Sequence, residues 1–354
     1  MIFEIDKDLD TNIYGNPSSN SEPRTRLSAK DDRKIEKILD DLIEKLLPKT
    51  VKHSYQQSPA ERRVDFAAIK KALDDDQIRV DLALRVPIRK VLDDLIELIK
   101  RQDKSGGITD SFVMGITLTT GPEAQKILGD YLLKVWKHGR ELAVNELPEK
   151  LHSKVKKFAG LEPVRAINFF QNLRPWLVKG IIDDDLKKAA RLELTEHLKG
   201  GRTTTETIGN LRSAWEPWIG DPTKVIPSGI SGTAADILQA YRLENIVRTE
   251  AITALSQGRA EIADEAGDFV IGYQLSPILD ERTSEVCNRI GELEEQGRPV
   301  QYRKDDPRAE KLTPALHYQC RTIPVFITTD DLPVRWSTEA ELDSVLRLVP
   351  EGFK

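Results

Sequence analysis

Hydrophobic residues recur every three or four positions through most of the first 267 residues of the chain. In residues 31–47 the isoleucines and leucines fall on one stripe of a helix, with charged residues between them. The same spacing returns in residues 58–73, 86–100 and 122–147. The pattern predicts a series of unlike amphipathic helices rather than a repeat of fixed length.

Two further segments predict longer helices. Residues 183–201 begin with three aspartates and end with lysine and two glycines, an order that suits the helix dipole and a glycine cap. Residues from about 234 to 266 continue the helical spacing with only Gly258 as an interruption. At the helical rise this second segment is roughly 45 Å long.

The pattern changes after Gly267. Short runs rich in β-branched and aromatic residues predict strands at 269–275, 299–302 and 321–328. A short helix is expected between the first two strands, within residues 280–293. Residues 337–349 predict a closing helix, for which Ser337 or Thr338 is the candidate N-cap.

The fold class expected from these elements is α+β, with a mostly α-helical body followed by a small C-terminal mixed α/β module. The expected regions are an extended N-terminal arm at 1–29, an N-terminal helical region at 30–120, a helical domain at 121–267, the module at 268–330, and a C-terminal helix and tail at 331–354.

Composition narrows the classes of protein that fit. The charged share of 31% and the net charge of −5 suit long solvated helices, and they give no global attraction to DNA or to anionic membranes. No run approaches 18 apolar residues, and the acidic N-terminus lacks the features of a secretory signal. Two cysteines in 354 residues favour synthesis in a reducing cytoplasm.

Both cysteines and one of the five histidines lie in the C-terminal module. Cys287, His317 and Cys320, with Asp280 as a fourth ligand, supply the residue types of a tetrahedral zinc site. The alternatives are buried thiols beside a hydrogen-bonded histidine, and a disulfide that closes a loop of about 34 residues. A Cys287–His317 nucleophile oriented by Asp280 is a further alternative, but no glycine-rich oxyanion loop accompanies it.

Other signals of chemistry are weak. The chain has no phosphate-binding glycine loop, no dinucleotide fingerprint and no HExxH zinc motif. Aspartate runs at 74–76 and 183–185 suggest a divalent metal, yet consecutive acids do not share a helical face. Acids at the starts of helices are ordinary partners of the helix dipole, which is the interpretation we favour.

A basic segment lies between residues 134 and 157. Its side chains would bind the phosphates of duplex DNA without reading base sequence, or simply form a solvated face. The candidate DNA-binding residues are Lys134, Lys137, Arg140, Lys150, Lys154, Lys156 and Lys157.

Three motifs in residues 165–330 together resemble the phage Mu F-like family, the minor head proteins of tailed bacteriophages. The family pattern is an Arg-Thr-Glu on a long helix, then Asp-x-Arg-Thr-x-x-x-Cys, then Pro-x-x-His-x-x-Cys-Arg. The matching residues are Arg248, Thr249 and Glu250; Asp280, Arg282, Thr283 and Cys287; and Pro314, His317, Cys320 and Arg321. Many members continue with another cysteine where this chain has Thr322, which removes one candidate metal ligand.

The resemblance implies a structural, non-enzymatic protein of the virion, located inside the capsid near the portal. Its implied partners are the portal protein, capsid or scaffolding proteins, and packaged double-stranded DNA, with no membrane. It would support head morphogenesis and the packaging or ejection of the genome. No cofactor is expected apart from the candidate zinc.

Within this picture we expect one structural cluster in the module, because a small sheet needs cross-links where burial is limited. Its members are Asp280, Arg282, Thr283, Cys287, His317, Cys320 and Arg321.

Two other classes of function remain open from the sequence. Related modules occur fused to toxin enzymes, so the chain could be a phage-delivered effector, although only 33 residues follow Arg321. A DNA-binding accessory protein is the third class, and the acidic net charge argues against it.

Overall fold

The computed structural model describes most of the chain beyond residue 59. The described residues are 60–64, 66–159, 164–200, 202–220, 238, 240–277, 283–318 and 320–351. All of them belong to one compact unit. The predicted arm at 1–29 and the predicted helix at 31–47 lie outside these residues.

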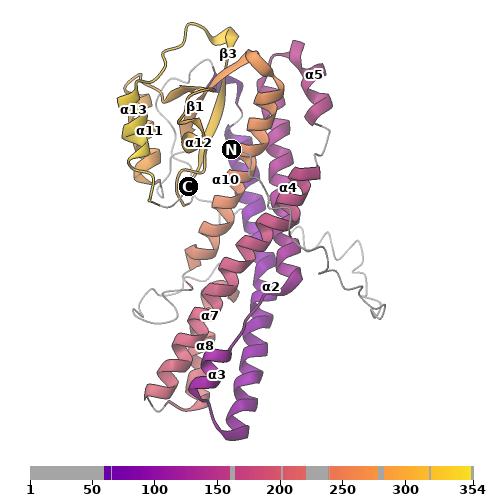
Figure 1. The fold of residues 1–354 in the computed structure, drawn as a ribbon, viewed down its shortest axis with the longest axis vertical. Coiled ribbons are helices and arrows are strands. Elements are labelled where there is room, and N and C mark those ends of the chain that lie inside the picture. The colour runs from indigo at the N-terminus through magenta and orange to yellow at the C-terminus, as the bar shows by residue number, and fades with distance from the viewer. Residues whose placement is uncertain are drawn as a thin grey trace, which may run out of the picture. The chain divides into compact units, whose positions relative to one another are not determined.

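The first long element is α2, Phe66–Gly106, which follows the short 3-10 turn η1, Glu61–Arg63 (Figure 1). Residues 66–73 of the first predicted run and the whole run at 86–100 therefore lie in one helix, and Pro87 is inside it. Val80 and Leu84 are buried between the two runs, so they continue one apolar face through the intervening residues.

The rest of the helical body consists of helices that pack on one another and on α2 (Figure 1). Their bounds are α3 Asp110–Gly115, α4 Gly121–Glu146, α5 Glu149–Ala159, α6 Val164–Asn168, the π-helical turn η2 Phe169–Leu173, α7 Arg174–Gly200, α8 Thr204–Ile219 and α10 Ala240–Glu265. The predicted helices at 122–147 and 234–266 correspond to α4 and α10 within the described residues. No described helix has a stretch apolar enough to span a membrane.

Helix α7 corrects one prediction, because it begins at Arg174 and not at the aspartate run. Asp183 therefore lies inside the helix, where it accepts hydrogen bonds from the backbone N–H and the hydroxyl of Thr120 at 2.8 and 2.7 Å. Asp185 pairs with Arg242 of α10 at 2.9 Å. Asp183 and Asp185 therefore bind residues of other elements, and they do not interact with the N-terminal dipole of α7. The other aspartate run, at 74–76, also lies inside a helix, namely α2.

Helices α4 and α10 approach each other closely at two glycines. A Cβ atom at Gly139 would collide with the backbone of Leu255, and one at Gly258 would collide with the backbone of Trp136. The backbones can pack this closely because both positions lack a side chain. This contact explains why Gly258 interrupts the apolar pattern of the long helix without ending it.

The C-terminal module contains a three-stranded antiparallel sheet with strand order β2-β1-β3. The strands are β1 Val270–Pro277, β2 Gln301–Arg303 and β3 Thr322–Thr328, close to the three predicted segments. The remaining elements are η3 Gly267–Phe269, α11 Glu285–Glu295, α12 Ala309–Leu312, η4 Thr329–Asp331 and α13 Glu339–Leu346. Thr338 caps α13 in a capping box with Glu341, which confirms Thr338 as the N-cap. The fold is thus α+β and mostly helical.

Module and body share one apolar core. A single cluster of buried side chains extends from Leu84 and Trp136 in the helices to Val325 and Leu342 in the module. At its edge the fully buried Arg259 of α10 forms a bidentate ion pair with Glu146 of α4, both contacts at 2.6 Å. The same guanidinium donates to the carbonyl of Pro324 in β3 at 2.8 and 3.1 Å.

Candidate functional site

Helix α11 places Cys287 at the centre of the module. Ser284 is the N-cap of this helix, and its hydroxyl accepts a hydrogen bond from the Cys287 backbone at 3.4 Å. The cysteine is therefore in the first turn, on the buried face of the helix, and only 3% of its surface is exposed.

His317 and Cys320 come from the segment before β3. The backbone N–H of Cys320 donates to the carbonyl of His317 at 3.3 Å, so a tight turn holds the two residues together. Both side chains are buried. The ligand atoms of Cys287, His317 and Cys320 all lie within 4.8 Å of one another, as the sequence predicted.

Hydrogen bonds fix the orientation of the His317 ring. Its Nδ1 atom lies 2.6 Å from the carbonyl oxygen of Tyr318, which can only accept, so Nδ1 carries a proton. The Nε2 atom then faces the Cys287 sulfur at 2.9 Å and the Ser284 hydroxyl at 2.8 Å. The hydroxyl of Thr322 contacts the same sulfur at 3.0 Å.

The two cysteine side chains are buried next to each other, and their pKa values shift in opposite directions. The hydrogen bond to Cys320, together with burial, raises the pKa of Cys287 well above its usual value. Burial acts to raise the pKa of Cys320 too, but hydrogen bonds from Cys287 and His317 outweigh it and bring that pKa well below the usual value.

This geometry separates the chemical alternatives left open by the sequence. Both cysteines are free thiols in the structure. A buried Cys287 with a raised pKa is a poor nucleophile, because the thiolate is the reactive form. Two sulfurs and an imidazole nitrogen around one point remain a donor set that a soft divalent metal prefers.

The other predicted members of the cluster have different positions. Asp280 and Arg282 lie outside the described residues. The predictions that Asp280 is a fourth metal ligand and that Arg282 is a cross-link therefore stay predictions. Thr283 precedes the cap of α11, and its carbonyl accepts a hydrogen bond from the Asn288 side chain at 3.4 Å.

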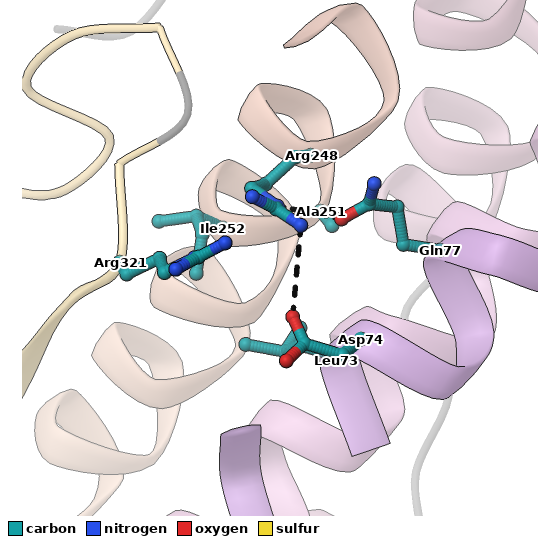
Figure 2. Close-up of a pocket in the computed structure, with 7 residues that line it drawn as sticks. All are labelled: Leu73, Asp74, Gln77, Arg248, Ala251, Ile252 and Arg321. Atoms are coloured by element: carbon teal, nitrogen blue, oxygen red, sulfur yellow. Dashed lines mark hydrogen bonds and ion pairs between the residues drawn. The ribbon is translucent and has the colours of Figure 1, made fainter. Parts of the chain in front are cut away.

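The side chain of Arg321 points away from the cysteine cluster, toward Arg248 of the helical body (Figure 2). It faces Arg248 of α10 across a small cavity of about 10 Å³, which has room for about one water molecule. Asp74 and Gln77 of α2 line the opposite side; Arg248 pairs with Asp74 at 3.7 Å and donates to Gln77 at 2.6 Å. Burial and the charge of Arg248 lower the pKa of Arg321 to about 10.

Of the other two residues of the Arg-Thr-Glu motif, Glu250 connects α10 to α7 and Thr249 bonds within α10. Glu250 forms a bidentate ion pair with Arg174 at the start of α7, with one contact at 2.8 Å. The hydroxyl of Thr249 donates to the carbonyl of Asn245 in its own helix at 2.7 Å. All three motif residues are at least nine-tenths buried.

The predicted basic segment is less cationic than its composition indicates. Arg140 is buried, stacks on the ring of Trp136 and pairs with Glu261 at 3.6 Å, which corrects its assignment as a DNA-binding residue. Lys134 pairs with Asp76 at 2.7 Å and Lys150 with Asp330 at 3.6 Å. Lys137 is half-buried, whereas all four lysines of α5 are exposed, including Lys150. The other three are Lys154, Lys156 and Lys157.

Several residues of the site were not found from the sequence. Ser284 could have been recognised as a helix cap that precedes Cys287 by three positions. The sequence marks Thr322 only as the position where many members of the resembling family have a cysteine, whereas in the structure its hydroxyl contacts the Cys287 sulfur. Asp74 and Gln77 have no sequence signal, because only the fold brings α2 beside Arg248 and Arg321.

The chain matches no known family model, and neither curated proteins nor solved structures give a significant match. The relation to minor head proteins therefore rests on the three motifs and stays a prediction.

Proposed function

We propose that this chain is a structural minor head protein of a tailed bacteriophage. It would be made in the host cytoplasm and incorporated into the capsid interior near the portal. There it would contact the portal protein and capsid or scaffolding proteins, and support head assembly and the packaging or ejection of DNA.

The observation that supports this proposal is the convergence of the three motifs. Cys287 of the second motif lies against His317 and Cys320 of the third. Arg321 of the third motif lines the same cavity as Arg248 of the first. Residues far apart in the chain thus meet at two adjoining buried sites, as expected if the motifs are the signature of one fold.

The burial of these two sites favours a structural role over catalysis. Cys287, His317, Cys320, Arg248 and Arg321 are each at least nine-tenths buried. Arg321 and Arg248 meet where the module lies against α10 and α2. Residues that hold a module against a helical body give the protein one defined shape. A protein that must fit between a portal and its capsid needs such a shape more than it needs an open cleft.

Co-expression with the cognate portal protein tests the proposal most directly. We expect the two proteins to co-purify and to elute together at micromolar concentration, while the portal protein of an unrelated phage does not retain the chain. Separate elution of the cognate pair would remove the main support for a portal-associated role.

Counting the protein in purified virions separates the classes of function. A minor head protein is present in a few copies per particle, whereas an accessory protein that acts only in the host is absent. A pulldown from infected cells then identifies the partner as portal protein, duplex DNA or a host target. Recovery of a host target without the portal would favour the effector class.

A further inference from the structure

We propose that Cys287, His317 and Cys320 bind one zinc ion, with an oxygen ligand at the fourth position. The inference rests on the arrangement of these side chains, and it holds whatever the biological role of the protein is.

The donor atoms are those that zinc prefers. Two thiolates and one imidazole form a Cys₂His set, and such sets occur in protein zinc sites. The three groups are buried side by side, and burial of the polar imidazole is favourable only if its nitrogens are bonded. They come from two segments, the first turn of α11 and the loop before β3, so one ion would cross-link them.

The spacing of the donor atoms is close to that of a tetrahedral site. Ligand atoms around a tetrahedral zinc ion are roughly 3.5–3.8 Å apart, given Zn–S and Zn–N bonds of about 2.3 and 2.0 Å. Here all three atoms lie within 4.8 Å of one another, and the Cys287 sulfur and His317 Nε2 are 2.9 Å apart. Side-chain shifts of about 1 Å or less would place the three atoms at bonding distance.

The surroundings of His317 supply an independent argument. Histidines that bind metals usually donate their other ring N–H to a carbonyl or carboxylate, which fixes the tautomer and the ring plane. His317 has this arrangement, because Nδ1 donates to the Tyr318 carbonyl at 2.6 Å. Its Nε2 atom therefore faces the Cys287 sulfur, at 2.9 Å, before any metal arrives.

Two hydroxyl groups mark the fourth position. The Ser284 oxygen lies 2.8 Å from His317 Nε2, and the Thr322 oxygen lies 3.0 Å from the Cys287 sulfur. A hydroxyl, or a water molecule held by both, would complete four-coordination. Because neutral oxygen is a weaker ligand than thiolate, the ion should be removable by strong chelators.

Metal analysis of the protein purified under reducing conditions, without chelators, tests the proposal. We expect one zinc per chain, loss of zinc on dialysis against a strong chelator, and a fall in the melting temperature that added zinc reverses. Cobalt substitution should produce the intense thiolate-to-cobalt absorption of a Cys₂His site.

Variants separate the site from general effects on folding. Cys320→Ser and His317→Gln should lose the zinc, while the matched control His197→Gln should keep it, because His197 bonds Thr207 in the helical body. Thr322→Cys adds a third sulfur beside Cys287 and should retain zinc at chelator concentrations that strip the unmodified protein.

The proposal fails if the reduced protein takes up no stoichiometric zinc after reconstitution, or if it prefers another metal. A Cys287–Cys320 disulfide that returns after reduction in the presence of zinc would likewise overturn it. Equal chelator resistance of Thr322→Cys and the unmodified protein would show that Thr322 does not adjoin the ion.

Discussion

At the scale of single residues, Asp331 shows how one carboxylate connects distant parts of the chain. It accepts hydrogen bonds from both terminal nitrogens of Arg63 at 2.7 and 2.8 Å, and from the backbone of Thr328 at 2.7 Å. Burial acts to raise the pKa of Asp331, but Arg63 and Thr328 together outweigh it and hold this pKa below its ordinary value. The segment before α2 is thereby fastened to the end of β3.

The lowered pKa predicts a pH-dependent contribution to stability. Asp331 stabilises the fold above its unfolded pKa of about 4, and this contribution is lost as the pH falls through the folded pKa. In urea denaturation Asp331→Asn should lower the free energy of unfolding by about 1–3 kcal/mol near neutral pH, and by much less in acid.

The control for this prediction is Glu97→Gln, which removes an exposed ion pair with Lys100 on α2. Its effect should be small at every pH, because exposed ion pairs contribute little. If Asp331→Asn lowers the free energy of unfolding by the same amount at acidic and neutral pH, the effect comes from the lost hydrogen-bond geometry and not from the charge.

Individual site residues could be predicted where their residue type is rare in the chain. Two cysteines and few histidines made Cys287, His317 and Cys320 conspicuous, and the structure brings them together. Arg140 was misplaced, because a cationic side chain on an amphipathic helix gives no indication that it stacks on Trp136 in the interior. Arg321 was expected beside the thiols, and it faces Arg248 instead.

At the scale of elements, the crossing of α4 and α10 depends on two positions without side chains. Gly139 faces the backbone of Leu255, and Gly258 faces the backbone of Trp136. An added methyl group would have to push two helix backbones apart, and a buried core resists such expansion.

Gly258→Ala should therefore destabilise the protein by about 1–3 kcal/mol, although alanine is the better helix former. The matched control is Gly180→Ala on α7, where nothing lies within 4 Å of an added Cβ atom. This change should stabilise the protein by up to about 1 kcal/mol. Thermal melts of the two variants that shift in the same direction would contradict the close crossing.

Elements were predicted best where the apolar period was unambiguous. The three strands and α4 are near their expected positions, because period two and period 3.6 differ clearly over those residues. The start of α7 was missed, because the aspartate run looks like a helix start while tertiary partners Thr120 and Arg242 decide its position. Pro87 did not end α2, since Leu84 and Ile88 around it are fully buried and hold the helix in the core.

At the scale of the whole molecule, any contact with DNA must be local, since the chain is acidic overall. Among the predicted candidates, the three lysines of α5 at 154, 156 and 157 are exposed, and no ion pair of theirs appears in the described part of the chain. Reversing their charges should greatly reduce retention on duplex DNA, and retention of the unmodified protein should fall steeply with salt.

The control carries the same charge change elsewhere on the surface, as Lys126→Glu, Lys188→Glu and Lys199→Glu. If retention depends only on net charge, both triple variants will lose binding equally, and α5 will have no special role. Retention of the α5 variant at the level of the unmodified protein would exclude these lysines.

The buried ion pair of Arg259 and Glu146 affects how cooperatively the protein unfolds. Its guanidinium bonds Glu146 of α4 and the carbonyl of Pro324 in β3, so hydrogen bonds of Arg259 break if either α4 or the sheet separates from α10. Leaving a buried polar or charged group without its partner is strongly unfavourable. Helices and sheet therefore act as a single foldon: hydrogen exchange deep in α10 and in β3 should report the same opening event.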